Sequence, residues 1–106
     1  MKLGIVIYSN DSEIVWNAFR FGNLALVTGD EVKVFLIGKG VELESIETTS
    51  FNVTEQLQTF VGSGGKIFAC STCLEIRQLK ASEMYTVAGI KELYDIVKES
   101  DKVIAF

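Results

Sequence analysis

Short apolar segments alternate with amphipathic segments along the whole chain, and this alternation most constrains the fold. Apolar runs occur at residues 3–8, 31–37, 66–69, 84–87 and 103–105. Continuous runs of this length are typical of strands that are covered on both faces. Strands that alternate with helices pair in parallel through right-handed crossovers. The sequence therefore predicts an α/β fold, a three-layer α/β/α sandwich with a mainly parallel sheet of about five strands.

Helices are predicted between these strands, at about residues 11–27, 53–61, 72–79 and 89–98. Three of them begin with a polar residue that has glutamate three positions later, which is a helix-capping pattern. The capping pairs are Asn10 with Glu13, Asn52 with Glu55, and Thr72 with Glu75. The polar stretch 41–50 is predicted to be irregular, with a short strand or turn at 41–43.

The first predicted helix has more apolar surface than a sheet can cover. At helical spacing its apolar side chains form two neighbouring lines: Ile14, Ala18, Phe21 and Ala25, and Val15, Phe19, Gly22 and Leu26. A helix that lies on a sheet needs only one such stripe. The second line favours packing against a neighbouring subunit, and close cover within a small core is the alternative. The apolar content of 48% fits buried subunit contacts.

The length and the charge limit the partners. A chain of 106 residues is one domain, 1–106, with a core of its own. The net charge is −4 and the lysines are scattered singly. Nucleic acids and anionic membranes bind clustered positive charge, so neither is expected as a partner. The opening residues lead into a strand and not a signal peptide, and no apolar run could span a membrane. With a close cysteine pair, this predicts a cytoplasmic location.

The chain contains no His and no Pro, and these absences remove several kinds of site. Ser-His and Cys-His catalysis cannot occur within one chain. A zinc site needs four ligands, and only two subunits that meet at a symmetry axis could supply four cysteines. We therefore expect no metal and no cofactor. A thioredoxin-type site relies on a cis-Pro that faces its Cys-x-x-Cys motif, so this chain is not a thioredoxin.

Cys70 and Cys73 are the obvious reactive element of the sequence. In open parallel sheets, binding and catalysis gather at the carboxyl ends of the strands. Those ends are residues 8–11, 38–40, 70–73 and 86–89. A helix start after Cys70 would direct backbone N–H groups and the helix dipole at the sulfur and lower the pKa of this thiol. Lys39 and Arg77 could add to this stabilisation.

Three roles of the cysteine pair stay open. A Cys70 thiolate could attack a persulfide or disulfide sulfur, and Cys73 could resolve the product as an intramolecular disulfide. The pair could instead act as a redox switch of two thiols. Free cysteines are also often small buried hydrophobic residues, and the chain would then be a non-catalytic, oligomeric module that binds a ligand or a protein.

The segment Gly64–Leu74, with Arg77 after it, resembles the DsrE/DsrF-like family of sulfur-relay proteins, in which a Gly-Gly strand leads into Cys-x-x-Cys-Leu and then Arg. The opening strand and helix and the closing residues 100–106 are also similar to that family. The resemblance implies a flavodoxin-like sandwich that assembles into dimers, trimers or hexamers. It also implies cytoplasmic sulfur trafficking as a sulfurtransferase-like persulfide carrier between donor and acceptor proteins.

The resemblance also assigns the site. Cys70 matches the sulfur-carrying position, and Cys73 matches a second cysteine that only some members have. The supporting residues are expected to be Ser71, Thr72, Arg77, Lys39 and Asn10. Ser71 and Gln78 stand where the family often has Gly, so the turn after the short helix is expected to differ in shape.

Overall fold

The computed structural model of the protein describes residues 1–47 and 49–106. Its strands are β1 (Lys2–Ile7), β2 (Glu31–Leu36), β3 (Lys66–Cys70), β4 (Thr86–Ala88) and β5 (Lys102–Ala105). Its α-helices are α1 (Ser12–Val27), α2 (Val53–Gly62), α3 (Ser71–Ile76) and α4 (Ile90–Glu99), and a 3₁₀ helix, η1, spans Gly38–Ser45.

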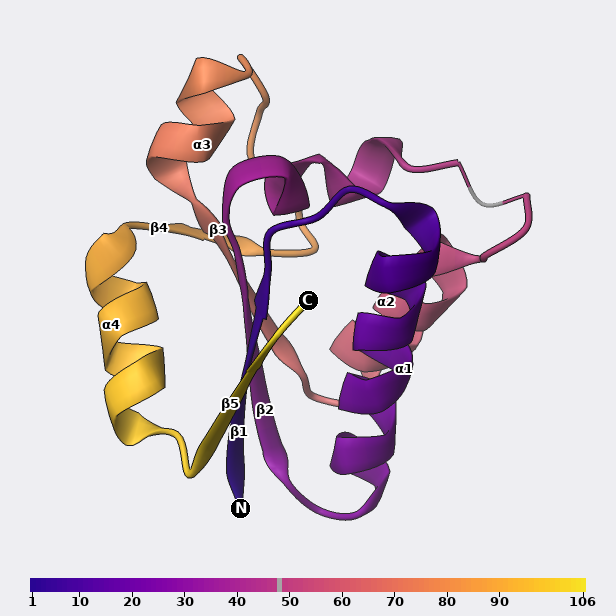
Figure 1. The fold of residues 1–106 in the computed structure, drawn as a ribbon, viewed down its shortest axis with the longest axis vertical. Helices are drawn as coiled ribbons and strands as arrows, with labels where there is room; N and C mark the ends of the chain where they lie inside the picture. The colour runs from indigo at the N-terminus through magenta and orange to yellow at the C-terminus, as the bar shows by residue number, and fades with distance from the viewer. Residues whose placement is uncertain (48) are drawn as a thin grey trace.

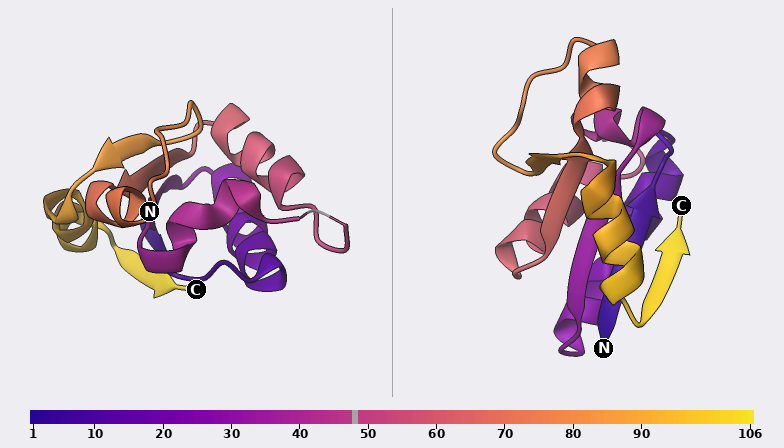
Figure 2. Two further views of the ribbon diagram at one scale, coloured as in Figure 1. Left: turned by 90° about the horizontal axis from the view of Figure 1, so that it is seen from above. Right: turned by 90° about the vertical axis from the view of Figure 1, so that its left-hand side faces the viewer.

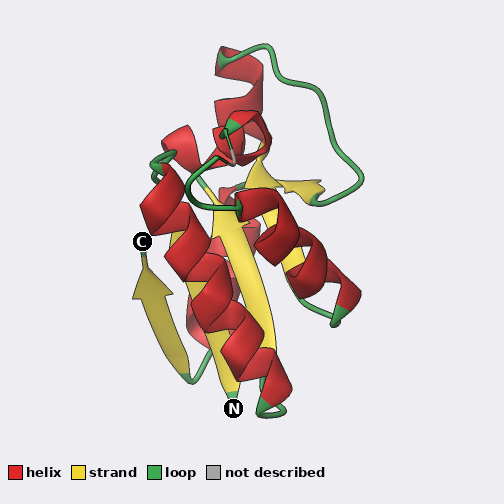
Figure 3. Cartoon of the chain, turned by 90° about the vertical axis from the view of Figure 1, so that its right-hand side faces the viewer, coloured by secondary structure: helices red, strands yellow, loops and turns green. Residues whose placement is uncertain are grey.

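The five strands form one parallel sheet in the order β4-β3-β2-β1-β5. Helices α1 and α2 lie side by side on one face (Figure 3), and α4 lies on the other face (Figure 1). The predicted three-layer sandwich is therefore confirmed, with a sheet that is parallel throughout. The order of the strands, which the sequence does not reveal, puts β1 and β5 next to each other.

The core lies mainly between the sheet and the two helices α1 and α2. Phe19 of α1 and Phe60 of α2 are fully buried there, and their rings meet edge to face with centroids 5.4 Å apart. The central strands are buried on both faces, which explains their continuous apolar sequences. All of β5 is exposed, because it lies at the edge of the sheet.

The starts of two helices differ from their predicted caps. Asp11, not Asn10, caps α1, because its carboxylate accepts a hydrogen bond of 3.0 Å from the N–H of Ile14. The predicted Thr72 cap is also wrong. Strand β3 runs into α3 without a loop, and Cys70 itself occupies the N-cap position. The cap at Asn52 is confirmed by its hydrogen bond from the N–H of Glu55.

Three segments have other bounds or conformations than predicted. The start of the polar stretch 41–50 belongs to η1, and Thr48 lies outside the described residues. The fourth strand is 86–88 and not 84–87. Helix α3 ends at Ile76, three residues before the predicted end, because Gln78 adopts a left-handed φ of 54° that stops the helix.

The carboxyl ends of the strands lie along one edge of the sheet, below α3 and η1 (Figures 1 and 2). The chain leaves β2 toward the face that α2 covers and leaves β4 toward the face that α4 covers. Strand β3 lies between these two strands and ends in the cysteine segment. This is the point where connections diverge to opposite faces, which is where open α/β sheets form binding crevices. Within the described residues, no helix is long and apolar enough to cross a bilayer.

Candidate thiol site

Cys70 is the last residue of β3, and the residue is only 6% exposed. Burial raises the pKa of the Cys70 thiol, and hydrogen bonding with Cys73 raises this pKa further. The backbone N–H groups of Cys73 and Thr72 act in the opposite direction, as predicted for a helix start, but the effect of burial is larger. The expectation that the pKa of Cys70 is lowered is therefore wrong.

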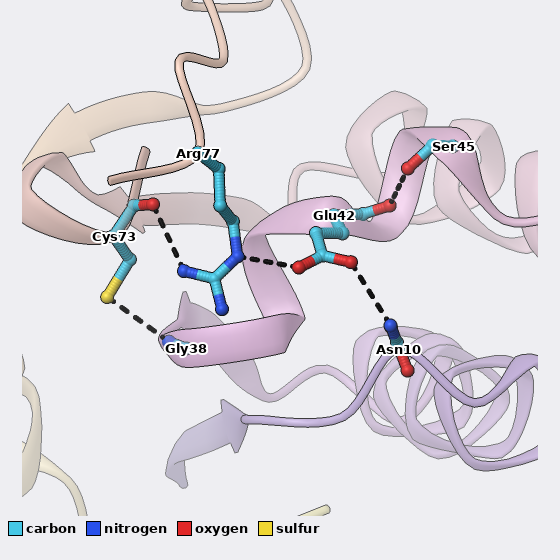
Figure 4. Close-up of polar contacts among 6 residues, drawn as sticks. All are labelled: Asn10, Gly38, Glu42, Ser45, Cys73 and Arg77. Atoms are coloured by element: carbon cyan, nitrogen blue, oxygen red, sulfur yellow. Dashed lines mark hydrogen bonds and ion pairs between the residues drawn. The ribbon is translucent and has the colours of Figure 1, made fainter. Parts of the chain in front are cut away.

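Cys73 lies one turn further on in α3 and is only half-buried. Its Sγ accepts a hydrogen bond of 3.2 Å from the backbone N–H of Gly38, the first residue of η1 (Figure 4). Both cysteines are free thiols. The helix start that donates an N–H group to Cys73 is therefore that of η1, which follows β2, and not that of α3.

Arg77 and Glu42 connect α3 with η1 (Figure 4). The Arg77 Nε lies 2.6 Å from the Glu42 carboxylate, and the Arg77 Nη1 donates a hydrogen bond of 3.2 Å to the carbonyl of Cys73. Asn10, after β1, donates a hydrogen bond of 3.1 Å to the other carboxylate oxygen of Glu42. These contacts fix the segments that follow β1, β2 and β3 relative to one another.

The predicted supporting residues fall into two groups. Asn10 and Arg77 belong to this polar network, although Arg77 contacts the backbone of Cys73 and not its sulfur. Lys39 follows Gly38 in η1, and its charge acts on Glu42. Ser71 and Thr72 begin α3, and their side chains form no hydrogen bond with the other described residues.

Sequence reasoning did not assign Glu42 or Gly38 to this site. Glu42 lies in the polar stretch 41–50 and Gly38 in the strand end 38–40, and neither position is part of a recognisable motif. The signal that could have identified Glu42 is its charge, because Arg77 needs an anion once both residues lie at the same edge of the sheet.

The Glu42–Arg77 contact predicts a pH-dependent loss of stability in Glu42→Gln. The guanidinium of Arg77, then the amide of Asn10, lower the pKa of Glu42 from its ordinary value of 4.5. The ionised carboxylate therefore stabilises the fold above pH 4.5, and this contribution is lost as the pH falls through the lowered value. Glu42→Gln should be less stable than the wild type at neutral pH, and the difference should shrink toward acid pH, as measured by urea unfolding along a pH series.

Glu44→Gln is the matched control, because it removes the same charge from an exposed position of η1. This variant should show no comparable change with pH. A Glu42→Gln deficit that stays constant from neutral to acid pH would contradict the ionic origin of the contribution.

The thiol site offers few ligands for a metal. Among residues 1–47 and 49–106, no three side chains of His, Cys, Asp or Glu come together in a way that could hold a metal ion. The chemical groups at this edge are two sulfur atoms, one N–H donor and a guanidinium that is already paired with a carboxylate. Such a set is suited to thiol chemistry, in which a thiolate attacks a sulfur–sulfur bond and displaces another thiolate.

The chain is similar to known proteins in both sequence and fold. The model of the DsrE/DsrF-like family matches residues 1–106. An uncharacterized protein of Methanopyrus kandleri is 35% identical over 100 residues, which cover 89% of this chain and 83% of that protein. An uncharacterized protein of Methanocaldococcus jannaschii is 32% identical over 114 residues, and the match covers all of both chains.

Solved structures with the same fold come from bacteria and archaea. The ychN protein from E. coli superposes with a TM-score of 0.82 at 17% identity, and the match covers all of both chains. A conserved protein of unknown function from Bacteroides thetaiotaomicron gives a TM-score of 0.79 at 20% identity, over 99% of this chain and 94% of the other. A protein of unknown function from Methanobacterium thermoautotrophicum gives 0.78 at 14% identity, over 97% of each chain.

Proposed function

Because the chain belongs to the DsrE/DsrF-like family over residues 1–106, we propose that it is a sulfur-relay protein that carries sulfur as a persulfide on Cys70, with Cys73 as an auxiliary or resolving thiol. The observation that carries the proposal is the pair of free thiols at the carboxyl end of β3, in the segment that resembles the family motif. A sulfurtransferase-like exchange needs only thiolate attack on a sulfur–sulfur bond, and so it needs neither His nor metal.

The surroundings of the two thiols suit a carrier. The side chain of Cys70 is shielded from solvent, so a persulfide at this position would be protected from stray thiols and oxidants. Cys73 is more exposed and lies within one helical turn. The proposed partners are sulfur donor and acceptor proteins in the cytoplasm, where thiols stay reduced.

Mass spectrometry after incubation with inorganic polysulfide tests the proposal. The wild type should gain the mass of one sulfur atom, which a reductant removes. The double variant Cys70→Ser/Cys73→Ser should not gain it. Two results together would show that Cys70 is not the carrier. The Cys70→Ser variant would still bind one added sulfur atom, and peptide mapping of the wild type would find no added sulfur on Cys70.

Burial of Cys70 also favours a second candidate, in which the cysteines only pack and the chain is a binding module. Thiol titration of the native protein distinguishes the two functions. A relay protein should have at least one thiol that reacts rapidly at neutral pH before unfolding. A binding module should have two thiols that react only after denaturation. A redox switch would instead form a reversible disulfide between Cys70 and Cys73, with a midpoint potential near the redox potential of the cytoplasmic thiol pool.

We also propose that a second copy of this chain covers an apolar surface formed by α1 and the end of β5. The exposed apolar residues of α1 are Ile14, Phe21, Leu24 and Val27. The ring of Phe21 lies 6.3 Å from that of Phe106, beside a shallow groove of about 440 Å³ that Leu24 and Ile104 also line. Exposed apolar patches of this kind mark association surfaces, and the outer edge of β5 is free to be covered.

Leu24→Glu should therefore weaken self-association, because it places a charge in the centre of this surface, where Leu24 is 62% exposed. Light scattering at micromolar concentration should show an oligomer for the wild type and a shift toward the 11.7 kDa chain for the variant. Ile76→Glu, at an exposed position of α3, is the control and should leave the oligomer intact. A wild type that is a clean monomer would reject the proposal.

A further inference from the structure

The two cysteines have opposite surroundings, and the difference bears on the order in which they react. Cys70 is shielded from solvent. Cys73 is partly open to solvent, and its sulfur receives the N–H of Gly38 at 3.2 Å. A hydrogen bond from a backbone N–H stabilises a thiolate more than a thiol. An incoming donor can also reach a half-exposed sulfur more easily than a buried one.

We infer that Cys73 is the entry thiol of the relay, which takes the sulfur from the donor and passes it inward to Cys70. This inference rests on the proposed function and reverses the order that the family pattern suggests. Geometry supports it, since Cys73 combines the N–H group of Gly38 with partial exposure, whereas Cys70 is buried and the effect of burial outweighs its own N–H groups.

The transfer has two balanced steps. In the first, the Cys73 thiolate attacks the outer sulfur of a donor persulfide, R–S–SH. A bond forms between Sγ and that sulfur, the donor sulfur–sulfur bond breaks, and the donor leaves as the thiolate R–S⁻. In the second, Cys70 attacks the same outer sulfur on Cys73. A bond forms between this sulfur and the Sγ of Cys70, and its bond to the Sγ of Cys73 breaks. The proton that Cys70 loses passes to the departing Cys73 thiolate, so no external oxidant or reductant is needed.

The polar network fixes the entry thiol in place. Gly38 begins η1, and Glu42 of η1 holds Arg77, which in turn donates to the carbonyl of Cys73. The N–H donor and the sulfur that accepts it therefore lie on two segments that an ion pair holds together. Gly38 has a φ of 57°, and a Cβ at this position would meet no other atom within 4 Å. A side chain here would strain the backbone without a steric clash.

Alkylation and sulfur loading test the inference on the single variants. With limiting iodoacetamide at fixed neutral pH, the native protein should be labelled at Cys73 about tenfold faster than at Cys70, because the sulfur of Cys73 is partly exposed and that of Cys70 is buried. With inorganic polysulfide, Cys70→Ser should load sulfur on Cys73 at nearly the wild-type rate. Cys73→Ser should load Cys70 about tenfold more slowly, as followed by peptide mapping at short times.

Gly38→Val tests the part played by the N–H donor. Valine at a left-handed φ should displace this N–H group and slow the labelling of Cys73. Gly64→Val is the matched control, because Gly64 also has a left-handed φ, of 95°, with no atom within 4 Å of a Cβ, and it lies before β3 at the opposite end of the strand. The control should lose comparable stability and keep the wild-type labelling rate.

The outcomes separate the inference from the proposed function. The inference would be overturned if Cys70 were labelled or loaded with sulfur faster than Cys73, and if Cys73→Ser still loaded sulfur on Cys70 at the wild-type rate. The proposed sulfur relay would then remain intact. A wild type that binds no sulfur on either residue would overturn the proposed function, and the entry role with it. Sulfur that appears on Cys73 first and on Cys70 later would support both.

Discussion

Phe60→Ala should destabilise the protein by about 3–5 kcal/mol, the cost of removing a buried aromatic side chain from a packed core. The Phe60 ring is fully buried and contacts Phe19 edge to face. It also fills a slot between two glycines. A Cβ on Gly22 would lie 2.9 Å from the ring, and a Cβ on Gly65 would overlap it. Because rigid backbone surrounds the ring on both sides, the cavity cannot close after truncation. Urea unfolding measures the loss.

Tyr94→Ala is the control for Phe60→Ala. It also removes an aromatic ring from a helix, but Tyr94 is 65% exposed on α4. Its effect should stay within about 0.5 kcal/mol. A loss below about 1 kcal/mol for Phe60→Ala would mean that α1 and α2 move together to refill the space, and that the slot between the glycines is not rigid.

Gly40→Ala should destabilise the protein by about 3 kcal/mol, at the upper end of the range for overpacking. A Cβ on Gly40 would overlap the carbonyl oxygen of Ile7 and lie 2.8 Å from its carbonyl carbon. These are backbone atoms at the end of β1, so neither can rotate away. The added methyl group would therefore displace η1 from the sheet, and with it the Gly38 N–H group that contacts Cys73. Thermal or urea unfolding measures the change in stability.

Gly62→Ala makes the same chemical change where there is room, because a Cβ at Gly62 would meet no atom within 4 Å. Gly62 is the last residue of α2, where alanine favours the helix, so this variant should be neutral or gain up to about 1 kcal/mol. If the Gly40→Ala and Gly62→Ala proteins were equally stable, η1 would have more room beside β1 than the distances at Gly40 indicate.

The strands predicted from apolar pattern were confirmed with small shifts in their bounds, and the caps predicted from a single polar residue were less accurate. The run at 31–37 and the structured β2 (Glu31–Leu36) differ by one residue, because a buried strand needs apolar side chains on both faces. Asn10 and Asp11 are adjacent and are both good caps, so a spacing rule could not choose between them. The prediction of Thr72 as a cap was wrong because no loop separates β3 from α3. The helix propensity of Thr72 contains no information about the length of this connection.

The site was partly predictable for a topological reason. Parallel strands bring their carboxyl ends to one edge, so the sequence could place Asn10, Lys39 and the cysteines in one region. It could not show that Glu42 pairs with Arg77, because this contact depends on η1, and an eight-residue 3₁₀ helix is too uncommon to expect from sequence. It also could not show that burial affects the pKa of Cys70 more strongly than the nearby N–H groups do, because burial is known only from the packed structure.

The neighbouring positions of β1 and β5 have a consequence for the order of folding. These strands pair although they come from opposite ends of the sequence, and the hydrogen bond from Lys2 to Asp101 joins residues 99 positions apart. Such long-range pairing forms slowly. During synthesis, β2 can pair with β1 early, whereas the other edge of β1 has no partner until residues 102–105 have left the ribosome. In that interval the nascent chain presents an apolar strand with an open edge to its surroundings, and this is the stage at which aggregation competes most strongly with folding.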